Sequence, residues 1–374
     1  MAPSPLSNPA FSEACPPDAR LAHVRWGDML LGVAIGDSVG AGLEFKSREW
    51  IEEHVDFTDY VSTGDGMWAE GFKEGVYTDD TEMTIGLVKA LIDAGGDPSK
   101  VNEDVLVKYW TAEYHDGKQR LGHGRLGHGS IAGYYEGKHS INEIREWQAR
   151  REYPGNAPVM RAVPLGFLPP ELMTKVCEVN ADATHPHPKG RAASILTARA
   201  VRYVVLDLSE RRKASSKPAL LASDSMIETK DYLEMVDQLP DHKLPEASSL
   251  DVLEALCGPQ PLKNPFDGSD CLGLNSDAMR TAGCVLYLLK WYTDPLEGLK
   301  AAVKMGGFVD SLAAVVLGTL GARYGLEGLN PNFVRKVECR EELQTLGQAY
   351  GEFIARLCAR PWSVTALRTG SKSP

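Results

Sequence analysis

Two adjacent acidic residues stand in the run from Tyr77 to Thr81 (Tyr-Thr-Asp-Asp-Thr), just before a strongly apolar segment. Threonine followed by acids is a common helix start, because these side chains cap free backbone N–H groups and suit the helix dipole. Their oxygens are also the ligands that Mg²⁺ prefers. Since a helix N-terminus repels a cation, a metal site here needs acids from another segment. Thr78, Asp79 and Asp80 are therefore either a helix cap or metal ligands with a partner.

A second segment rich in oxygen ligands lies near the C-terminal end of the chain. It runs from Gly306 to Ser311 (Gly-Gly-Phe-Val-Asp-Ser) and precedes the apolar residues 312–320. Asp310 and Ser311 again place hard oxygen atoms at the expected start of a helix. This segment is the candidate partner of the Thr-Asp-Asp run.

Two further segments carry groups suited to a bound substrate. Gly155 and Asn156 begin a turn that is either an ordinary loop or a phosphate-binding turn, in which backbone N–H groups hold the anion. His185 lies in a Thr-His-Pro-His-Pro run, where the prolines disfavour a regular helix, and it is a candidate for lining a pocket. We expect His123 and His128, in a glycine-rich stretch, to be exposed loop residues.

The elements that position these residues are predicted to be helices. Apolar residues recur at helical spacing, as at Met83, Leu87 and Leu91, and long alternating β-branched runs are absent from the sequence. We therefore predict a mostly or wholly α-helical domain, that is, an all-α fold class. The sequence shows no internal repeat.

Glycines at four-residue spacing mark one of these helices. Gly32, Gly36 and Gly40 share a helix face, and each glycine inside a helix costs about 1 kcal/mol relative to alanine. The stripe predicts close helix–helix packing. A second interpretation is that the backbones approach so that polar groups on the same segments converge. Glu44 follows the stripe as a further candidate acid, whereas Asp37 is equally consistent with a functional and a buried structural acid.

Composition suggests how the chain is divided. Residues 1–20 are rich in proline, serine and alanine and are predicted to form a disordered tail. Residues 21–365 are predicted to form the helical domain, and 366–374 a flexible C-terminal tail. Within the domain, residues 209–273 are polar and proline-rich, which indicates an insertion or lid.

Charge and cysteine content exclude several classes of protein. Lys and Arg number 40 against 51 Asp and Glu, a net charge of −11, which argues against a nucleic-acid or anionic-membrane surface. The seven scattered cysteines form no C-x-x-C pair, so neither a zinc site nor a disulfide framework is expected. The longest apolar stretch, 312–320, is far shorter than the roughly 20 residues of a membrane span. We expect a cytoplasmic protein; the sequence distinguishes neither cytoplasm from nucleus nor one oligomeric state from another.

Taken in order, these segments resemble the ADP-ribosylglycohydrolase family, which includes dinitrogenase-reductase-activating glycohydrolases and ADP-ribosylhydrolases. The resemblance extends from about Trp26 to Gly325. It implies a single compact, orthogonal multi-helix bundle with two Mg²⁺ ions. It also implies hydrolysis of a glycosidic bond between ADP-ribose and an acceptor, so that ADP-ribose or an ADP-ribosylated molecule is the expected partner.

The resemblance also assigns roles, residue by residue. Metal ligation falls to five residues of the two oxygen-rich segments: Thr78, Asp79, Asp80, Asp310 and Ser311. The implied catalytic residues are Glu44, as acid/base, with Asp79 and Asp80. The diphosphate is expected near Gly155 and Asn156, with His185 in the substrate pocket.

One position departs from the family pattern. Phe308 stands where the family has an acid, and its ring is expected beside the site. Because Mg²⁺ demands near-ideal octahedral geometry, loss of a ligand is expected to weaken one of the two ions. Three functions stay open: an ADP-ribosylglycohydrolase, a pseudoenzyme that binds ADP-ribose or a partner protein without turnover, and a hydrolase of another ribosyl compound.

Overall fold

The computed structural model describes residues 21–61, 73–206, 256–257, 262–263, 268 and 270–359. The predicted tails, 1–20 and 366–374, and most of the predicted insertion at 209–273 lie outside the described residues. The division of the chain into tails, domain and insertion therefore stays a prediction.

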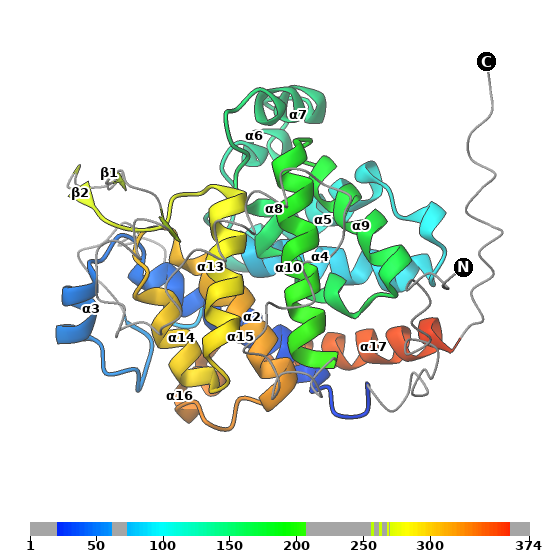
Figure 1. The fold of residues 1–374 in the computed structure, drawn as a ribbon. Helices are drawn as coiled ribbons and strands as arrows, with labels where there is room; N and C mark the ends of the chain where they lie inside the picture. The colour runs from blue at the N-terminus through cyan, green and yellow to red at the C-terminus, as the bar shows by residue number, and fades with distance from the viewer. Residues whose placement is uncertain are drawn as a thin grey trace, which may run out of the picture.

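The described residues form an all-α fold, as predicted (Figure 1). The α-helices are α2 (Trp26–Leu43), α3 (Arg48–His54), α4 (Asp79–Ala94), α5 (Glu103–Leu121), α6 (Ile131–Tyr135), α7 (Ile141–Ala149), α8 (Ala157–Met160), α9 (Pro170–Asp182), α10 (Pro188–Leu206), α13 (Ala278–Trp291), α14 (Pro295–Val303), α15 (Val309–Tyr324), α16 (Pro331–Lys336) and α17 (Arg340–Cys358). Two short 3₁₀ helices, η2 (Pro98–Lys100) and η3 (Val163–Phe167), join them. The strands β1 (Leu262–Lys263) and β2 (Asp270–Cys271) pair antiparallel.

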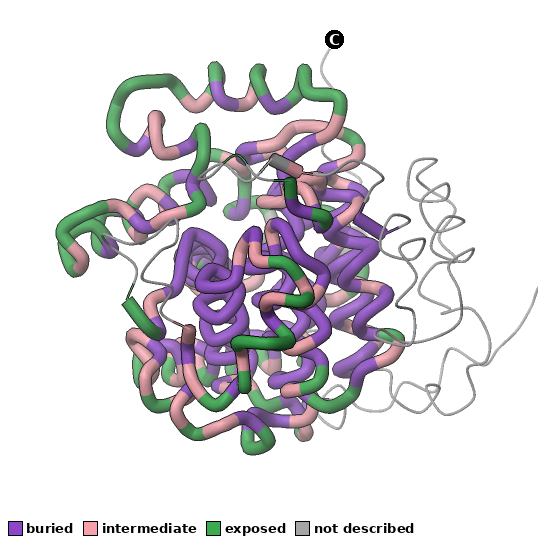
Figure 2. The backbone as a smooth tube through the Cα atoms, turned by 90° about the vertical axis from the view of Figure 1, so that its left-hand side faces the viewer, coloured by how far each residue is buried: buried purple, intermediate pink, exposed green. Residues whose placement is uncertain are grey.

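Helices α2 and α15 pack against each other at the centre of the molecule. Both consist mostly of apolar residues and are buried along almost their whole length, as core helices are (Figure 2). Around this pair, α17 packs on α2, α14 on α15, and α5 on α4. Helices α6 and α7 lie at the top of the body in Figure 1. Helix α7 is largely exposed, whereas every residue of α6 is buried or half-buried. Among the described helices, none combines the length and apolar character that crossing a bilayer requires.

The glycine stripe of α2 lies directly against α15. A Cβ atom on Gly32 would come within 2.6 Å of the Leu317 carbonyl oxygen, and one on Gly36 would overlap the carbonyl of Ala313. Gly40 faces the backbone of Asp310 in the same way. Both interpretations of the stripe therefore hold, because the close packing also brings the C-terminal end of α2 against the first turn of α15.

We expect Gly36→Ala to destabilise the protein, because the added methyl group meets rigid backbone rather than a movable side chain. Overpacking of this kind typically costs about 1–3 kcal/mol in the free energy of unfolding, which urea denaturation measures. Gly27→Ala is the matched control on the same helix, since the nearest atom to its Cβ would lie at 3.4 Å. Equal stability of the two variants would show that the stripe does not limit the packing distance.

Candidate active site

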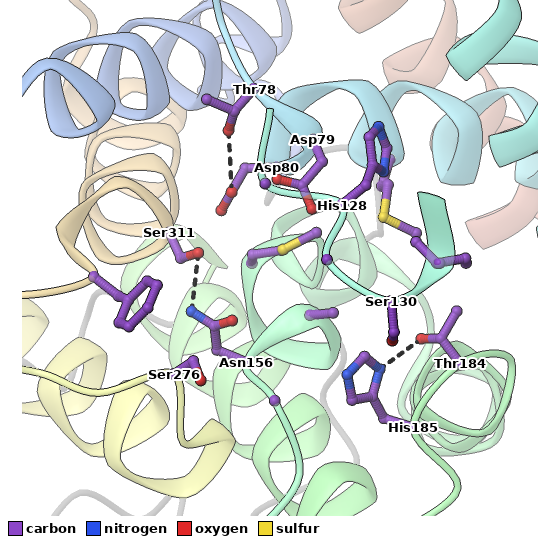
Figure 3. A pocket seen from close by; sticks show the side chains of 18 of the residues that line it. Thr78, Asp79, Asp80, His128, Ser130, Asn156, Thr184, His185, Ser276 and Ser311 are labelled. Carbon is purple, nitrogen blue, oxygen red and sulfur yellow. Dashed lines mark hydrogen bonds between the residues drawn. The ribbon is translucent and has the colours of Figure 1, made fainter. Parts of the chain in front are cut away.

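A cavity of about 370 Å³ opens where the first turns of α4 and α15 meet the end of α2 and the turn before α8. All nine predicted site residues line it: Glu44, Thr78, Asp79, Asp80, Gly155, Asn156, His185, Asp310 and Ser311. Figure 3 shows Asn156, Ser311 and His185 around the same open space as Asp79 and Asp80. Segments far apart in the sequence thus supply one site.

Asp37 holds the Thr-Asp-Asp run in place. Its carboxylate is fully buried and accepts hydrogen bonds from the backbone N–H and hydroxyl groups of both Thr78 and Thr81, at 2.6–3.1 Å. Burial raises the pKa of Asp37 to about 6, although the hydrogen bonds from the threonines oppose this shift. Of the two interpretations that the sequence left open, the structure supports the structural one: Asp37 orients the start of α4.

Four acidic side chains converge at one end of the cavity: Glu44, Asp79, Asp80 and Asp310. Burial raises the pKa of all four, and the negative charge of Asp310 raises the pKa of the other three further. Like charges in a buried site favour either bound protons or a bound cation. The arrangement is therefore an acidic end that is suited to a positively charged ligand.

The oxygen atoms of this end are of the kind that Mg²⁺ prefers as ligands. Asp80 Oδ1 and Glu44 Oε1 are buried and have no hydrogen-bond partner among the described residues. The described part of the chain contains no ready cluster of three or more His, Cys, Asp or Glu side chains around a metal position. Mg²⁺ commonly uses only one or two carboxylates and keeps several waters. The donor set fits such an ion, with the hydroxyl groups of Thr78 and Ser311 beside the carboxylates.

Phe308 lies beside the acidic end, where the sequence placed an aromatic ring. It lines the cavity and packs edge-to-face on Phe45, with ring centroids 4.9 Å apart and an interplanar angle of 76°. Helix α15 begins at Val309, so Phe308 is its N-cap residue and contributes no side-chain cap. The pair of rings forms an apolar wall where an acid would add an oxygen ligand.

The opposite side of the cavity carries hydrogen-bond donors. Asn156 donates from Nδ2 to Ser311 Oγ at 3.0 Å, which links the turn before α8 to α15. Gly155 lies against the imidazole, since a Cβ there would come within 2.9 Å of His185 Nε2. Burial, together with the nearby guanidinium of Arg161, lowers the pKa of His185 to about 3. His185 is therefore neutral at neutral pH.

A chain of hydrogen bonds holds the imidazole of His185 in place. Arg161 Nη2 donates to Thr184 Oγ1 at 2.8 Å. Thr184 Oγ1 lies in turn at hydrogen-bond distance from His185 Nδ1, at 2.8 Å (Figure 3). With Nδ1 engaged by Thr184, the other ring nitrogen, Nε2, lies beside Gly155.

Arg161 itself is fully buried beneath the cavity. Its guanidinium donates to Asn180 Oδ1 at 2.6 Å and lies 3.9 Å from the centre of the Trp110 ring. Burial lowers the pKa of Arg161 to about 9, while the charges of Asp79 and Asp80 raise it. The positive charge of Arg161 therefore partly offsets the negative charge of the acidic end.

His128 is not the exposed loop residue that the sequence predicted. His123 is exposed as predicted, but His128 is 6% exposed and lines the cavity, with Nε2 2.6 Å from Glu82 Oε2. A Cβ at Gly127 would overlap the Asp79 carboxylate, so the loop before α6 packs directly on the acidic end. The glycine-rich stretch was the available signal, because glycine permits such close approach.

Buried charges anchor this loop from behind. Arg125 pairs with Glu82 at 3.2 Å and with Glu338 at 2.8 Å, and it donates to the Tyr77 carbonyl at 2.8 Å. Leu126 accepts a hydrogen bond from the backbone N–H of Asp79 at 3.0 Å. The loop and the start of α4 therefore form one hydrogen-bonded unit.

Comparisons with known proteins agree with this geometry. A family model described as ADP-ribosylglycohydrolase matches residues 20–361. The chain is 24% identical over 357 residues to ADP-ribosylarginine hydrolase Tri1 of Pseudomonas putida (strain GB-1), covering 92% of this chain and 83% of the relative. It is 23% identical over 330 residues to the protein of the same name from Serratia proteamaculans (strain 568), covering 85% and 76%.

A solved structure described as an ADP-ribosylglycohydrolase-related protein complex supports the fold. It superposes with a TM-score of 0.57 at 20% sequence identity, over 90% of this chain and 99% of that chain. The helical architecture is thus shared over most of the chain. With the family model matching nearly the entire chain, we conclude that this chain belongs to the ADP-ribosylglycohydrolase family.

Proposed function

We propose that this protein is a Mg²⁺-dependent hydrolase that cleaves a glycosidic bond between ADP-ribose and an acceptor. The observation that carries the proposal is the convergence of Glu44, Asp79, Asp80 and Asp310 at one end of a single cavity, with the donors of Asn156 and His185 opposite. Two relatives are named ADP-ribosylarginine hydrolases. Their names favour the N-glycosidic bond to arginine as the first linkage to test.

In this proposal each end of the cavity has its own task. When bound, Mg²⁺ supplies a positive charge that orients sugar hydroxyl groups and stabilises negative charge. Glu44 Oε1, which is buried and free of hydrogen bonds within the described residues, is positioned to exchange a proton with an attacking water. Asn156 and His185 hold the distal part of the substrate, and the wall formed by Phe45 and Phe308 excludes water.

Asp80→Asn is expected to abolish the rise in melting temperature that Mg²⁺ produces, because it removes a charged ligand whose Oδ1 has no protein partner among the described residues. A ligand that binds only the folded state raises its stability by mass action. Without Mg²⁺ the variant should be at least as stable as the parent, since burial and Asp310 raise the pKa of Asp80. Differential scanning fluorimetry with and without Mg²⁺ measures both effects.

Asp116→Asn is the control, because Asp116 lies on the exposed surface of α5 and, among the described residues, its one ion pair is with Arg120 at 2.8 Å. It should keep the full Mg²⁺ shift. If Asp80→Asn keeps that shift as well, the Thr-Asp-Asp run is a helix cap and not a metal site.

Phe308 favours a second candidate, a pseudoenzyme that binds ADP-ribose without turnover. Phe308 packs on Phe45 in the cavity wall, at the position where the family pattern implies an acid, so a second Mg²⁺ would lack that ligand. An arginine-ADP-ribosylated peptide incubated with Mg²⁺ separates the candidates, with free ADP-ribose as the readout. Release supports the hydrolase; stabilisation by ADP-ribose without release supports the pseudoenzyme. Release only from other ribosyl compounds in a substrate panel would support the third function.

A further inference from the structure

The cavity has a second charged group that the proposed chemistry does not use. Arg151, two residues beyond the end of α7, is exposed and lines the cavity. Within the described residues it forms no ion pair, and its contacts are weak. Its Nη1 lies 3.5 Å from Gln148 Oε1, and its guanidinium lies 5.5 Å from the centre of the Tyr153 ring. Most of the five guanidinium donors are thus free of protein partners among the described residues and are available beside the cavity.

The neighbouring arginine behaves differently. Arg150 is 77% exposed in its side chain, does not line the cavity, and pairs with Glu146 at 3.2 Å one helical turn earlier. Two adjacent residues of the same type therefore face two environments. Arg150 neutralises the carboxylate of Glu146 on the outer surface. The charge of Arg151 is available to a ligand in the cavity.

Arg151 lies in a group of donors, away from the acidic end. Its positive charge contributes to lowering the pKa of His185, after burial and Arg161, so the two residues are within electrostatic range. The buried amide of Gln148 donates from Nε2 to Ser130 Oγ at 3.2 Å and offers Oε1 to Arg151. Arg151, Ser130 and His185 all line the cavity. This end is therefore built for an anion.

We propose that Arg151 binds the diphosphate of an ADP-ribosyl substrate and makes the site selective for ribosyl compounds that carry phosphate; this inference rests on the proposed function. The four acids repel a diphosphate from their own end, whereas a planar guanidinium pairs two of its N–H groups with phosphate oxygens. Anchoring the phosphates at Arg151 directs the ribose toward Glu44. Neutral ribosides lack this anchor.

Binding constants measured by calorimetry test the inference with two variants, Arg151→Gln and the matched control Arg150→Gln. The probes are ADP-ribose, inorganic diphosphate and neutral adenosine. Since hydrogen bonds to charged groups contribute about 1.5–3 kcal/mol, Arg151→Gln should weaken ADP-ribose and diphosphate binding by about 10-fold or more. Arg150→Gln should leave both constants unchanged, and neither variant should alter the affinity for adenosine.

Salt dependence supplies a readout that a merely structural role would not change. Binding of an anion to an exposed cation weakens as salt screens the charges, so the affinity for ADP-ribose should fall less steeply with NaCl in Arg151→Gln than in the parent. Arg151→Lys should retain part of the affinity, because it keeps the charge but not the fork of donors.

Three outcomes would overturn the inference. The first is an affinity for ADP-ribose that is unchanged in Arg151→Gln. The second is a loss of ADP-ribose affinity in Arg150→Gln as large as that in Arg151→Gln. The third is a loss of adenosine affinity in Arg151→Gln as large as its loss of ADP-ribose affinity. A parent protein that binds neither ADP-ribose nor diphosphate would overturn it together with the proposed function. If the parent binds ADP-ribose through Arg151 but releases none from modified peptides, the hydrolase proposal fails and the Arg151 inference stands.

Discussion

Glu44→Gln is expected to lower kcat for ADP-ribose release by at least about 100-fold. Positioned acid–base groups typically contribute about 10²- to 10⁴-fold to a rate, and the Glu44 carboxylate faces the cavity with Oε1 free of hydrogen bonds within the described residues. The affinity for ADP-ribose should change little, because the amide keeps the size of the side chain. Steady-state kinetics together with calorimetric binding constants separate the two effects.

Glu49→Gln provides the comparison, since Glu49 is exposed in the first turn of α3, five residues further along the chain. It should retain the activity of the parent. A Glu44→Gln variant with undiminished kcat would remove Glu44 from the mechanism. A loss of Mg²⁺ binding in this variant would instead show that Glu44 acts mainly as a ligand.

Phe308→Asp is expected to strengthen Mg²⁺ binding and to raise the rate of ADP-ribose release. The change adds a carboxylate at the cavity wall beside Asp310, where the chain now has an aromatic pair. Replacing a fully buried phenylalanine costs about 3–5 kcal/mol in the free energy of unfolding. Phe308 is only partly buried, so the loss should be smaller. Calorimetry should show a higher affinity or a larger number of Mg²⁺ ions per chain.

Phe308→Asn separates the charge from the loss of the ring. Both variants lose the contact with Phe45, so their stabilities without Mg²⁺ should be similar, apart from the repulsion that a fifth acid adds. Only the aspartate variant should gain Mg²⁺ affinity and rate. If it gains neither, Phe308 does not occupy a vacant ligand position, and the aromatic wall belongs to a pseudoenzyme or to a site for another substrate.

The sequence was sufficient to predict the fold class and to identify the acids that lie together at the acidic end of the cavity. Helical spacing of apolar residues predicted an all-α fold, and acids at two expected helix starts predicted that Asp79 and Asp310 face each other. A few adjacent residues are enough to specify each of these two helix starts. The chemistry of the acidic end could therefore be read from short motifs.

The supporting groups could not be predicted, because their roles depend on distances between segments. Nothing near Asp37 in the sequence indicates that its carboxylate receives four donors from the start of α4. His128 has the same glycine-rich surroundings as His123, yet only His128 is drawn inward, by Glu82. Arg150 and Arg151 are adjacent and identical in type. Only the structure distinguishes the arginine that faces the cavity.

The packing of α2 against α15 makes the positions of the cavity acids depend on the thermal stability of the core. Glu44 follows one of these helices directly and Asp310 lies in the first turn of the other, so the acidic end rests on the two most deeply packed elements. Arg151, in contrast, follows the largely exposed helix α7. Local opening of an exposed element costs far less than opening of a core. On moderate warming, the proposed binding of phosphate by Arg151 would therefore weaken first. The four acids would keep their positions until the whole helical bundle unfolds.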